Sequence, residues 1–500
     1  MYAIGVDSGT QGTKVLIVDF EGKILGRGFA PHRFVEGLRP GESEQDPQEW
    51  IQAFDKALQQ AIKHAGIPRS EIVSLGVSGQ QHGFVPLDEG GHPIRPAKLW
   101  NDTSTVEETD LLIENLGGKS GCIQRLGISL AVGYTASKIL WLRRREPENY
   151  KKLSIILLPH NYINYVLTGI DHMEFGDASG TGLMDIRERI WSKAAITAID
   201  PELEAKLPSL SHPSKPVGLM ERDMARRFGL YKVLVASGSG DNMMGAIGTG
   251  NVKPGLCSLS LGTSGTVYSY FAEPFVDPQG EIAAFCDGTG GWLPLLCTMN
   301  VTNTTGHLKS LFEISNEELE HMASQASPGA SNLLFLPYVD GERVPVLPFA
   351  SGVFFGLNRK TFTRSCMARA IMEGAIFNLG YGFARMKSLG LIPAEIRATG
   401  GGSKSRLWLQ IVADIFQTPV VTLKEEEAAA LGAAIQSIWN YHCSQGRKVK
   451  IEELTEKMVK LEQGTVEPRQ DTFSLYERLQ DQFNSLWKTL KEEFKSLRNS

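Results

Sequence analysis

The sequence predicts an α/β protein built from two domains, and three observations lead to this prediction. The chain has 500 residues, which is long for one hydrophobic core and comfortable for two. Short apolar runs joined by turns open the chain and then alternate with helical patterns, as expected for sheets covered by helices. The pattern Gly-Thr-x-Gly-Thr occurs at residues 9–13 and again at residues 262–266. Because both copies lie between apolar runs, we interpret them as an internal duplication.

The first part of the chain predicts an antiparallel meander, a helix and a further strand. The strands of the meander are expected at residues 3–6, 14–18 and 24–27, with turn residues between them. Asp46 is a good N-cap for the helix, Pro47 suits its first position, and Glu49 completes a start that resembles a capping box. The apolar run at residues 72–77 then predicts a buried strand.

The second part repeats this organisation. A strand at residues 233–236 leads into a Gly-Asp-Asn turn, and a strand at residues 396–399 leads into three glycines and a helix. Glycines and Pro254 cluster between residues 246 and 255, so we place a domain boundary there. The predicted domains are residues 1–246 and residues 247–440. A charged, helix-prone tail at residues 441–500 is expected to pack on the second domain through the apolar side chains Phe483, Leu486, Leu490 and Phe494.

The composition argues against several classes of protein. The net charge of −5 is mild for this length and lacks the basic excess of a nucleic-acid-binding protein. The apolar run at residues 153–159 is too short to cross a membrane and predicts a buried strand, and no signal-peptide pattern opens the chain. The six cysteines are scattered without a CxxC pair, which favours free thiols in a reducing compartment. We therefore expect a cytosolic protein without a membrane or nucleic-acid partner.

The two glycine-rich turns predict a site for a polyphosphate. Backbone N–H groups in such turns can approach phosphate oxygens closely, and Thr and Ser hydroxyls add further donors. Two such hairpins from opposite domains are expected to clamp the phosphates of ATP. Asp7 ends the first strand beside one hairpin, where a carboxylate needs a cation, and Mg²⁺ with its water shell supplies one. An Asp that only closes the turn is the alternative.

Asp241 is the candidate general base. It follows a strand and a glycine, and a carboxylate at this position can accept the proton of an attacking hydroxyl. Polar residues also follow extended runs in the first domain, where ligands of α/β proteins bind. Trp100 could cover one face of a sugar, and His82, Asn101 and Asp102 could bind its hydroxyls.

In this order, the motifs resemble those of the FGGY carbohydrate kinases over nearly the whole chain, from residue 1 to about residue 441. The stretches that carry the resemblance are residues 5–10, 43–50, 79–83, 99–102, 138–141, 240–242, 261–265, 336–338, 341–345, 352–357 and 400–403. The resemblance implies the actin-like ATPase fold, in which two duplicated ribonuclease-H-like domains enclose a central catalytic cleft. It also implies ATP and Mg²⁺ as cosubstrate and cofactor, and dimers are frequent in the family.

The resemblance implies roles for individual residues. Asp241 would be the general base, and Asp7 would lie near magnesium and the transferred phosphoryl group. Sugar contacts would come from Gln81, His82 and Asn242, together with Asp241. The acceptor would be D-xylulose, phosphorylated at its 5-hydroxyl. The residues expected to bind ATP are Thr10, Gln11, Thr13, Lys14, Gly262, Thr263, Ser264, Gly400, Gly401, Gly402 and Ser405.

Three positions depart from the family pattern. Ser104 stands where an Arg is usual, Asn161 stands where an Asp is common, and Cys366 replaces an acidic or amide residue. The first two belong to the sugar-binding half, so another ketopentose, a polyol or a sugar acid stays open as the acceptor. An ATPase that controls a protein partner and a catalytically silent sugar sensor are the alternatives from other classes. The polar cluster around His82 argues against the first, and the presence of both Asp7 and Asp241 argues against the second.

Overall fold

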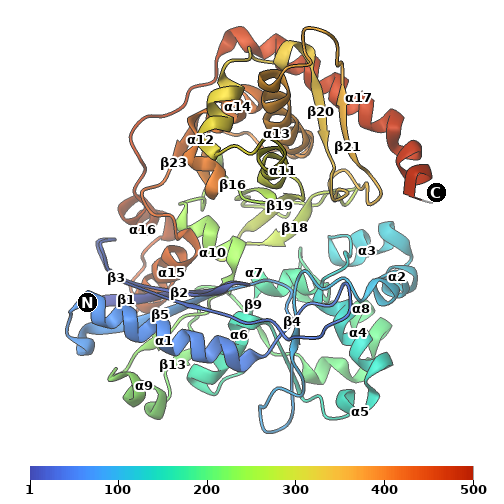
Figure 1. The fold of residues 1–500 in the computed structure, drawn as a ribbon. Helices are drawn as coiled ribbons and strands as arrows, with labels where there is room; N and C mark the ends of the chain where they lie inside the picture. Colours follow the sequence, from blue (N-terminus) through green and yellow to red (C-terminus); the bar gives the residue numbers. More distant parts are fainter. Residues whose placement is uncertain (499–500) are drawn as a thin grey trace. The chain divides into compact units, whose positions relative to one another are not determined.

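In the computed structural model, which describes residues 1–498, the chain forms two compact units (Figure 1). Unit 1 comprises Met1–Lys253, Tyr270–Leu293 and Glu427–Lys460, and unit 2 comprises Pro254–Ser269, Pro294–Glu426 and Leu461–Ser500. The limits predicted from the sequence, at residues 246 and 440, divide the chain into consecutive pieces. The units are instead discontinuous in sequence, because Tyr270–Leu293 and Glu427–Lys460 belong to unit 1.

The sheet of unit 1 has the order β13-β14-β5-β1-β2-β3, and β15 pairs with the end of β5. Strands β1, β2 and β3 are antiparallel neighbours, which confirms the predicted meander. Strands β5, β14 and β15 run parallel to β1. The bounds of these strands are β1 Tyr2–Ser8, β2 Gly12–Asp19, β3 Ile24–Pro31, β5 Ile72–Gly79, β13 Gly218–Leu219, β14 Leu234–Val235 and β15 Ser239–Gly240.

Two helices cover opposite faces of this sheet, α1 (Pro47–Ala65) on β3 and α15 (Ala428–Ser444) on β1 and β5 (Figure 1). Glycines in the strands let the helices approach closely, because a Cβ on Gly28 would lie 1.9 Å from a carbonyl oxygen of α1. Asp46 caps α1 by accepting from the backbone N–H of Gln48, as predicted. Glu49 does not complete a capping box but pairs with Arg33, with 2.9 Å between Oε1 and Nη2.

The remaining elements of unit 1 are helices and short strands outside this sheet. Its other helices are α2 Val106–Asn115, α3 Gly118–Leu126, α4 Thr135–Arg145, α5 Pro147–Tyr150, α6 Pro159–Thr168, α7 Phe175–Ala178, α8 Lys193–Ile199, α9 Arg222–Phe228, α10 Asp241–Gly248 and α16 Ile451–Met458. Its short strands are β4 Glu44–Gln45, β6 Val85–Leu87, β7 Ala97–Lys98, β8 Ile155–Leu157, β9 Met173–Glu174, β10 Met184–Asp185, β11 Ile190–Trp191, β12 Leu210–Ser211 and β18 Ala283–Cys286. The strand predicted at residues 153–159 is thus shorter than expected, because Pro159 begins α6.

Five strands of the unit 2 sheet run in the order β19-β17-β16-β22-β23. Strand β17 is antiparallel to both β16 and β19, and β22 and β23 are parallel to β16. The bounds are β16 Leu256–Leu261, β17 Gly265–Ser269, β19 Trp292–Thr298, β22 Glu395–Thr399 and β23 Val420–Thr422, with a separate hairpin of β20 Leu334–Pro337 and β21 Gly352–Phe355. The helices are α11 Thr302–Phe312, α12 Asn316–Ser324, α13 Arg364–Ser388, α14 Arg406–Phe416 and α17 Phe473–Arg498.

The C-terminal helix α17 packs within unit 2. Phe483 and Phe494 are buried in a cluster that includes Tyr338 and Phe377, and Leu486 and Leu490 pack partly buried against it. The buried Arg369 also donates to the Tyr476 hydroxyl, with 3.0 Å between Nη2 and the oxygen. The tail was predicted to pack on the second domain from residue 441 onward, but residues 441–460 belong to unit 1. Positions 499 and 500 of the predicted tail lie outside the described residues.

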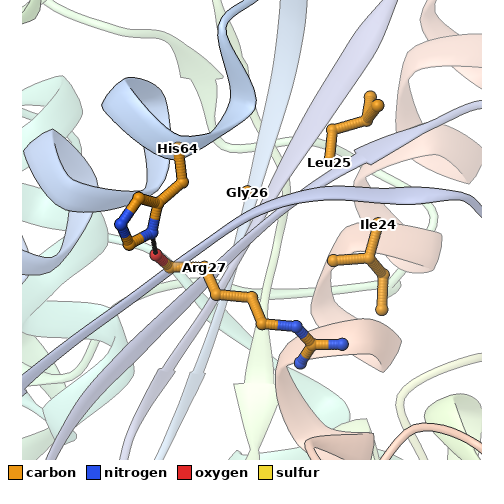
Figure 2. Close-up of a pocket in the computed structure, with 5 residues that line it drawn as sticks. All are labelled: Ile24, Leu25, Gly26, Arg27 and His64. Atoms are coloured by element: carbon orange, nitrogen blue, oxygen red, sulfur yellow. Dashed lines mark hydrogen bonds between the residues drawn. The ribbon is translucent and has the colours of Figure 1, made fainter.

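None of the helices in the described part of the chain is both long and apolar enough to cross a membrane. A hollow on unit 1 is lined by Ile24, Leu25, Gly26, Arg27 and His64 (Figure 2). There the Nδ1 atom of His64 lies 2.7 Å from the Arg27 carbonyl oxygen. This hollow contains none of the residues predicted to bind ATP or sugar.

Candidate active site

The predicted acidic residues lie where parallel strands of unit 1 end together. Asp7 is opposite Ser78 in the pairing of β1 with β5, and Gly240 is opposite Gly79 in the pairing of β15 with β5. Asp241 follows directly as the first residue of α10. Asp7 and Asp241 therefore flank the end of β5 from its two sides, at the edge where α/β proteins bind ligands.

The environment raises the pKa of both carboxyl groups. Burial dominates at Asp7 and raises its pKa, although the Ser78 hydroxyl donates to Oδ1 at 2.8 Å and Lys14 lies nearby. Burial also raises the pKa of Asp241 to about 7, and the negative charge of Asp7 adds to this shift. This effect of Asp7 on Asp241 shows that the structure brings the two predicted acids together. A carboxyl group with a pKa near neutrality is suited to accept a proton at neutral pH.

Two amide side chains connect Asp241 to the end of β5. The Asp241 Oδ1 atom accepts from the backbone N–H of Asn242 at 2.8 Å and from its Nδ2 at 3.1 Å. Asn242 Nδ2 also donates to Gln81 Oε1 at 2.7 Å. The structure thus joins three of the predicted substrate residues in one hydrogen-bonded group.

His82 lies beside this group in a left-handed backbone conformation, with a φ of 59°. Its ring packs against Tyr134 with 4.6 Å between centroids, and its Nδ1 lies 2.7 Å from the Gly180 carbonyl oxygen. Lys138 supports the same turn, because its buried Nζ donates to the carbonyl oxygens of His82 and Gly133 at 2.6 Å each. Burial lowers the pKa of Lys138 to about 7. In the sequence, Lys138 stood out only as part of a stretch that resembles the family, and its role in supporting this turn was not predicted.

Trp100 is tied to the first glycine-rich hairpin. Its Nε1 donates to Thr10 Oγ1 at 2.9 Å, and Thr10 Oγ1 donates to Gln80 Oε1 at 3.2 Å. The Trp100 side chain remains 37% exposed, and the neighbouring Asn101 is exposed as well. An exposed aromatic ring held at the site is suited to cover an apolar face of a sugar.

Asp102 differs from its predicted role. Its carboxylate is fully buried, with Oδ2 accepting from the Ser43 backbone N–H at 2.9 Å and from Lys98 Nζ at 3.0 Å. Its Oδ1 accepts from the backbone N–H of Ser104 at 3.0 Å and from its hydroxyl at 2.6 Å. The buried Lys98 ammonium requires a counter-charge, and Asp102 and Glu44 both supply one at 3.0 Å. Asp102 therefore holds the loop that carries Trp100 through its buried protein partners.

The other hairpin residues predicted to bind ATP in unit 1 have different surroundings. Gln11 is exposed, and Lys14 pairs with Glu427 at 2.5 Å. Thr13 is buried, and its hydroxyl contacts Ser8 Oγ at 3.2 Å and His32 Nε2 at 2.8 Å. The Thr13 hydroxyl therefore stabilises the hairpin through buried contacts.

In unit 2 the structure brings the remaining predicted ATP residues together. The hairpin between β16 and β17 closes with a hydrogen bond of 3.1 Å from the N–H of Gly262 to the Ser264 carbonyl oxygen, and the side chains of Thr263 and Ser264 are exposed. Gly400 packs on the same hairpin, because a Cβ at this position would lie 2.8 Å from the Leu261 carbonyl oxygen. Its φ of 82° also favours glycine. Gly401 and Gly402 follow in a short 3₁₀ turn.

Ser405 caps α14 in unit 2. Its side-chain oxygen accepts from the backbone N–H of Trp408 at 3.2 Å. The hydroxyl predicted to bind ATP therefore already stabilises a helix N-terminus.

Sequence reasoning missed a buried polar cluster beneath Gln81. It comprises His160, Asn161, Glu174 and Asp177, all with side chains at most 1% exposed. The short stretch around Asn161 was the one part of this region that stood out, as a departure from the family pattern. Glu174 and Asp177 lie in a segment without a recognisable motif, so no sequence signal pointed to them.

A metal ion would have few protein ligands here. Within residues 1–498, no group of three or more His, Cys, Asp or Glu side chains is arranged to hold one. The pair Asp7 and Asp241 offers carboxyl oxygens to a hard cation, and the two groups lie near enough for the charge of Asp7 to raise the pKa of Asp241.

Comparison with known proteins matches most of the chain to one family. Residues 2–248 match the N-terminal domain of the FGGY family of carbohydrate kinases, and residues 257–441 match its C-terminal domain. The chain is 45% identical over 444 residues to a xylulose kinase of Haemophilus influenzae, covering 87% of this chain and 90% of the relative. It is 32% identical to a xylulose kinase of Bacillus subtilis over the full length of both chains.

Solved structures give the same result for the fold. The crystal structure of xylulose kinase from Rhodospirillum rubrum superposes with a TM-score of 0.91 at 25% identity, covering 99% of this chain and 100% of that chain. This match confirms the predicted actin-like ATPase fold. Together, the two domain matches and the curated relatives show that the chain belongs to the FGGY family of carbohydrate kinases.

Proposed function

We propose that this carbohydrate kinase transfers the γ-phosphoryl group of ATP to D-xylulose, giving D-xylulose 5-phosphate and ADP. The observation that carries the proposal is the similarity to xylulose kinases over most of the chain, at up to 45% identity among the relatives named above. The group formed by Asp241, Asn242 and Gln81 agrees with it, since a sugar hydroxyl needs both a proton acceptor and hydrogen-bonding partners.

Asp241 is the residue to which we assign the proton transfer. A pKa of about 7 makes it a stronger base than an ordinary Asp, and a large fraction is still ionised at neutral pH. Asn242 donates twice to Oδ1 and so fixes the rotation of the carboxylate. We assign Oδ2 to the attacking hydroxyl, which loses its proton to Asp241 as the bond to phosphorus forms.

Asp7 is the residue to which we assign the divalent cation, through bound water. Kinases of this family use ATP with a divalent metal, and Mg²⁺ fits because Asp7 and Asp241 repel each other while both are ionised. When bound, the ion neutralises part of the phosphate charge. Glycine-rich turns in unit 2 offer backbone N–H groups to the phosphates, and the exposed hydroxyls of Thr263 and Ser264 add donors. In unit 1 we keep Gln11 and Lys14 as candidates for ATP binding, whereas we assign the Thr10 hydroxyl to holding Trp100, to which it is bonded together with Gln80.

The sugar contacts in this proposal are Gln81, His82, Asn242, Trp100 and Asn101. Asp102 and Ser104 act indirectly, because they hold Lys98 and the loop that carries Trp100. Ser104 stands where an Arg is usual in related xylulose kinases, so a long cation is missing at this position, and the Ser104 hydroxyl is bonded to Lys98 and Asp102. A related ketopentose, a polyol or a sugar acid is the alternative acceptor that this difference favours.

The test is coupled ADP release with magnesium-ATP and a panel of acceptors. The panel contains D-xylulose, D-ribulose, L-ribulose, L-xylulose, D-fructose, glycerol, xylitol and gluconate. We expect D-xylulose to give the highest kcat/KM. Preference for another acceptor would support the mechanism but change the assigned substrate. The absence of ADP release with every acceptor of the panel would contradict the proposal. The cytosolic location and the dimer expected from the sequence stay predictions.

A further inference from the structure

A buried polar cluster lies directly behind the substrate amide Gln81, and the reaction described above does not use it. Its members come from three elements of unit 1: His160 and Asn161 from α6, Glu174 from β9, and Asp177 from α7. All four side chains are buried, with at most 1% of their surface exposed. Buried polar groups are costly unless they serve a structural or functional purpose, so this cluster requires an explanation.

Glu174 fixes the backbone that carries Asp177. Its carboxylate accepts from the backbone N–H groups of Gly176 and Asp177 and so caps α7, and it accepts from the Ser239 hydroxyl at 2.7 Å. Ser239 belongs to β15, one residue before Gly240 and two before Asp241. Glu174 thereby ties α7 to the strand that leads into the general base.

His160 holds one oxygen of Asp177. Its Nδ1 lies 2.8 Å from Asp177 Oδ2, and its Nε2 lies 2.9 Å from Asn161 Nδ2. Burial lowers the pKa of His160 to about 4, so the ring is neutral and one of its two nitrogens is an acceptor. An amide at position 161 can present either a donor or an acceptor to the ring, whereas the Asp common in the family can only accept when ionised. Asn161 therefore supports His160 in either tautomer.

The other oxygen of Asp177 faces Gln81. A Cβ on Gly240 would lie 2.9 Å from Gln81 Cδ and 3.1 Å from Asp177 Oδ1, so the two side chains meet over this glycine. Gln81 is near enough to lower the pKa of Asp177, although burial still holds that pKa well above its usual range. Within the described chain, however, neither Gln81 Nε2 nor Asp177 Oδ1 completes a hydrogen bond.

The orientation of the Gln81 amide follows from these neighbours. Its oxygen accepts from Asn242 Nδ2 at 2.7 Å, which leaves its NH₂ group on the side of Asp177. Rotating the amide would place two NH₂ groups against each other at Asn242 and two acceptors against each other at Asp177. Asp177 Oδ1 is an acceptor when the carboxylate is ionised and also when Oδ2 carries the proton, so in both of these states it favours the NH₂ group of Gln81.

We propose that Asp177 is a positioning residue that orients the Gln81 amide and, through Asn242, the general base Asp241. Asp177 does not touch the sugar. It acts by keeping the Gln81 oxygen toward Asn242. The Asn242 Nδ2 group can then donate both to Gln81 Oε1 and to Asp241 Oδ1. The proposal rests on the proposed function, because it assigns the consequence of the cluster to binding and phosphorylation of a sugar.

The main test compares Asp177→Leu with Asp177→Asn. Leu has a similar size but no acceptor, so we expect the KM for D-xylulose to rise roughly 10- to 100-fold while the KM for ATP stays unchanged. Asn is expected to remain near the wild type, because its oxygen can face Gln81 while its NH₂ donates to His160 Nδ1. A matched control is Asp277→Leu, since Asp277 is also buried in unit 1 but holds a loop through the N–H groups of Gln279, Glu281 and Ile282. It should lower the unfolding temperature and leave the sugar KM unchanged.

A double-mutant cycle separates positioning from general damage. If Asp177 acts through Gln81, Asp177→Leu adds no further loss to Gln81→Ala, whereas independent effects would multiply. Multiplying effects, or an unchanged sugar KM in Asp177→Leu, would overturn the proposal. If Asp177→Leu does not fold, Asp177→Ser replaces it, because the shorter side chain can still meet His160 but does not reach Gln81.

The design also distinguishes failure of this inference from failure of the proposed function. The absence of sugar-dependent turnover in the wild type would count against the proposed function. The double-mutant cycle of Asp177 and Gln81 would then be measured as D-xylulose affinities by titration calorimetry. Normal turnover in the wild type with equal sugar affinity in all Asp177 variants would count against the inference.

Discussion

The sheets of the two units follow the same path, β3-β2-β1-β5-β14 in unit 1 and β19-β17-β16-β22-β23 in unit 2. In each, three antiparallel strands are followed by two parallel ones, and the glycine-rich hairpin joins the corresponding strands. The shared path supports the duplication that the repeated Gly-Thr-x-Gly-Thr pattern predicts.

The strand ends differ in their chemistry. β1 reaches its hairpin through Asp7, whereas the position two residues before the Gly-Thr pattern in unit 2 is Ser260. β5 continues into Gln80, Gln81 and His82, whereas β22 continues into three glycines. One copy of the fold therefore presents side chains that can move a proton and bind hydroxyls. The other presents backbone N–H groups, which suit phosphate oxygens whatever else the ligand carries.

The largest expected effect comes from removing the proposed general base of unit 1, Asp241. Asp241→Ala should lower kcat by roughly 10²–10⁴-fold, because it removes a positioned general base, while ATP still binds. Coupled ADP release gives kcat, and calorimetry gives ATP affinity. Asp414→Ala is the control in unit 2, since Asp414 is a buried carboxylate that pairs with Arg469. It should cost stability and leave kcat near the wild type, and retained turnover in Asp241→Ala would refute the assignment of the base.

The dependence of activity on pH should also reflect unit 1. The general base must be ionised, so kcat/KM for the sugar should fall about tenfold per pH unit below a pKa of about 7, the value to which burial and Asp7 raise Asp241. Asp7→Asn removes the negative charge and should move this acidic limb to lower pH, alongside any loss of metal-dependent rate. A limb that stays in place in Asp7→Asn would show that the two carboxyl groups are not coupled.

The next largest effect is expected from the glycine-rich turn of unit 2, on stability and on the KM for ATP. Gly400→Ala places a Cβ 2.8 Å from the Leu261 carbonyl oxygen at a φ of 82°, which should cost about 1–3 kcal/mol of stability and raise the KM for ATP. The KM for the sugar should not change. Gly401→Ala serves as the control for strain, because no described atom would lie within 4 Å of its Cβ and its φ is not positive. Equal loss of unfolding temperature in both variants would contradict the close-packing argument.

The sequence predicted the parts of the molecule that depend on local patterns. The meander, the N-cap at Asp46 and the two hairpins follow from turn residues and alternation, and Asp241 was identified from its position after a strand. Roles that depend on distant partners were not predictable in this way. Asp102 faces the buried Lys98, and Thr13 faces His32, so both turn inward.

Asp177 shows the same limit more clearly. Its importance comes from contacts with His160, which is 17 residues away, and with Gln81, which is farther still along the chain. Neither spacing forms a recognisable motif, because the contacts arise only when α6, α7 and the end of β5 pack together. The departure at Asn161 was visible, but its meaning required the position of His160.

The smallest expected effect comes from the second residue of each Gly-Thr pattern, where the two units can be compared position by position. Thr10→Val removes the acceptor of Trp100 Nε1 and the donor to Gln80 Oε1, so it should raise the sugar KM about fivefold, the effect of a net loss of about 1 kcal/mol. Thr263→Val removes an exposed hydroxyl assigned to phosphate and should raise the ATP KM by a similar factor without changing the sugar KM. Steady-state kinetics with each substrate varied in turn measures both values. If both variants changed the same KM, the proposal that the strand ends of unit 1 bind the sugar and those of unit 2 bind the phosphates would be wrong.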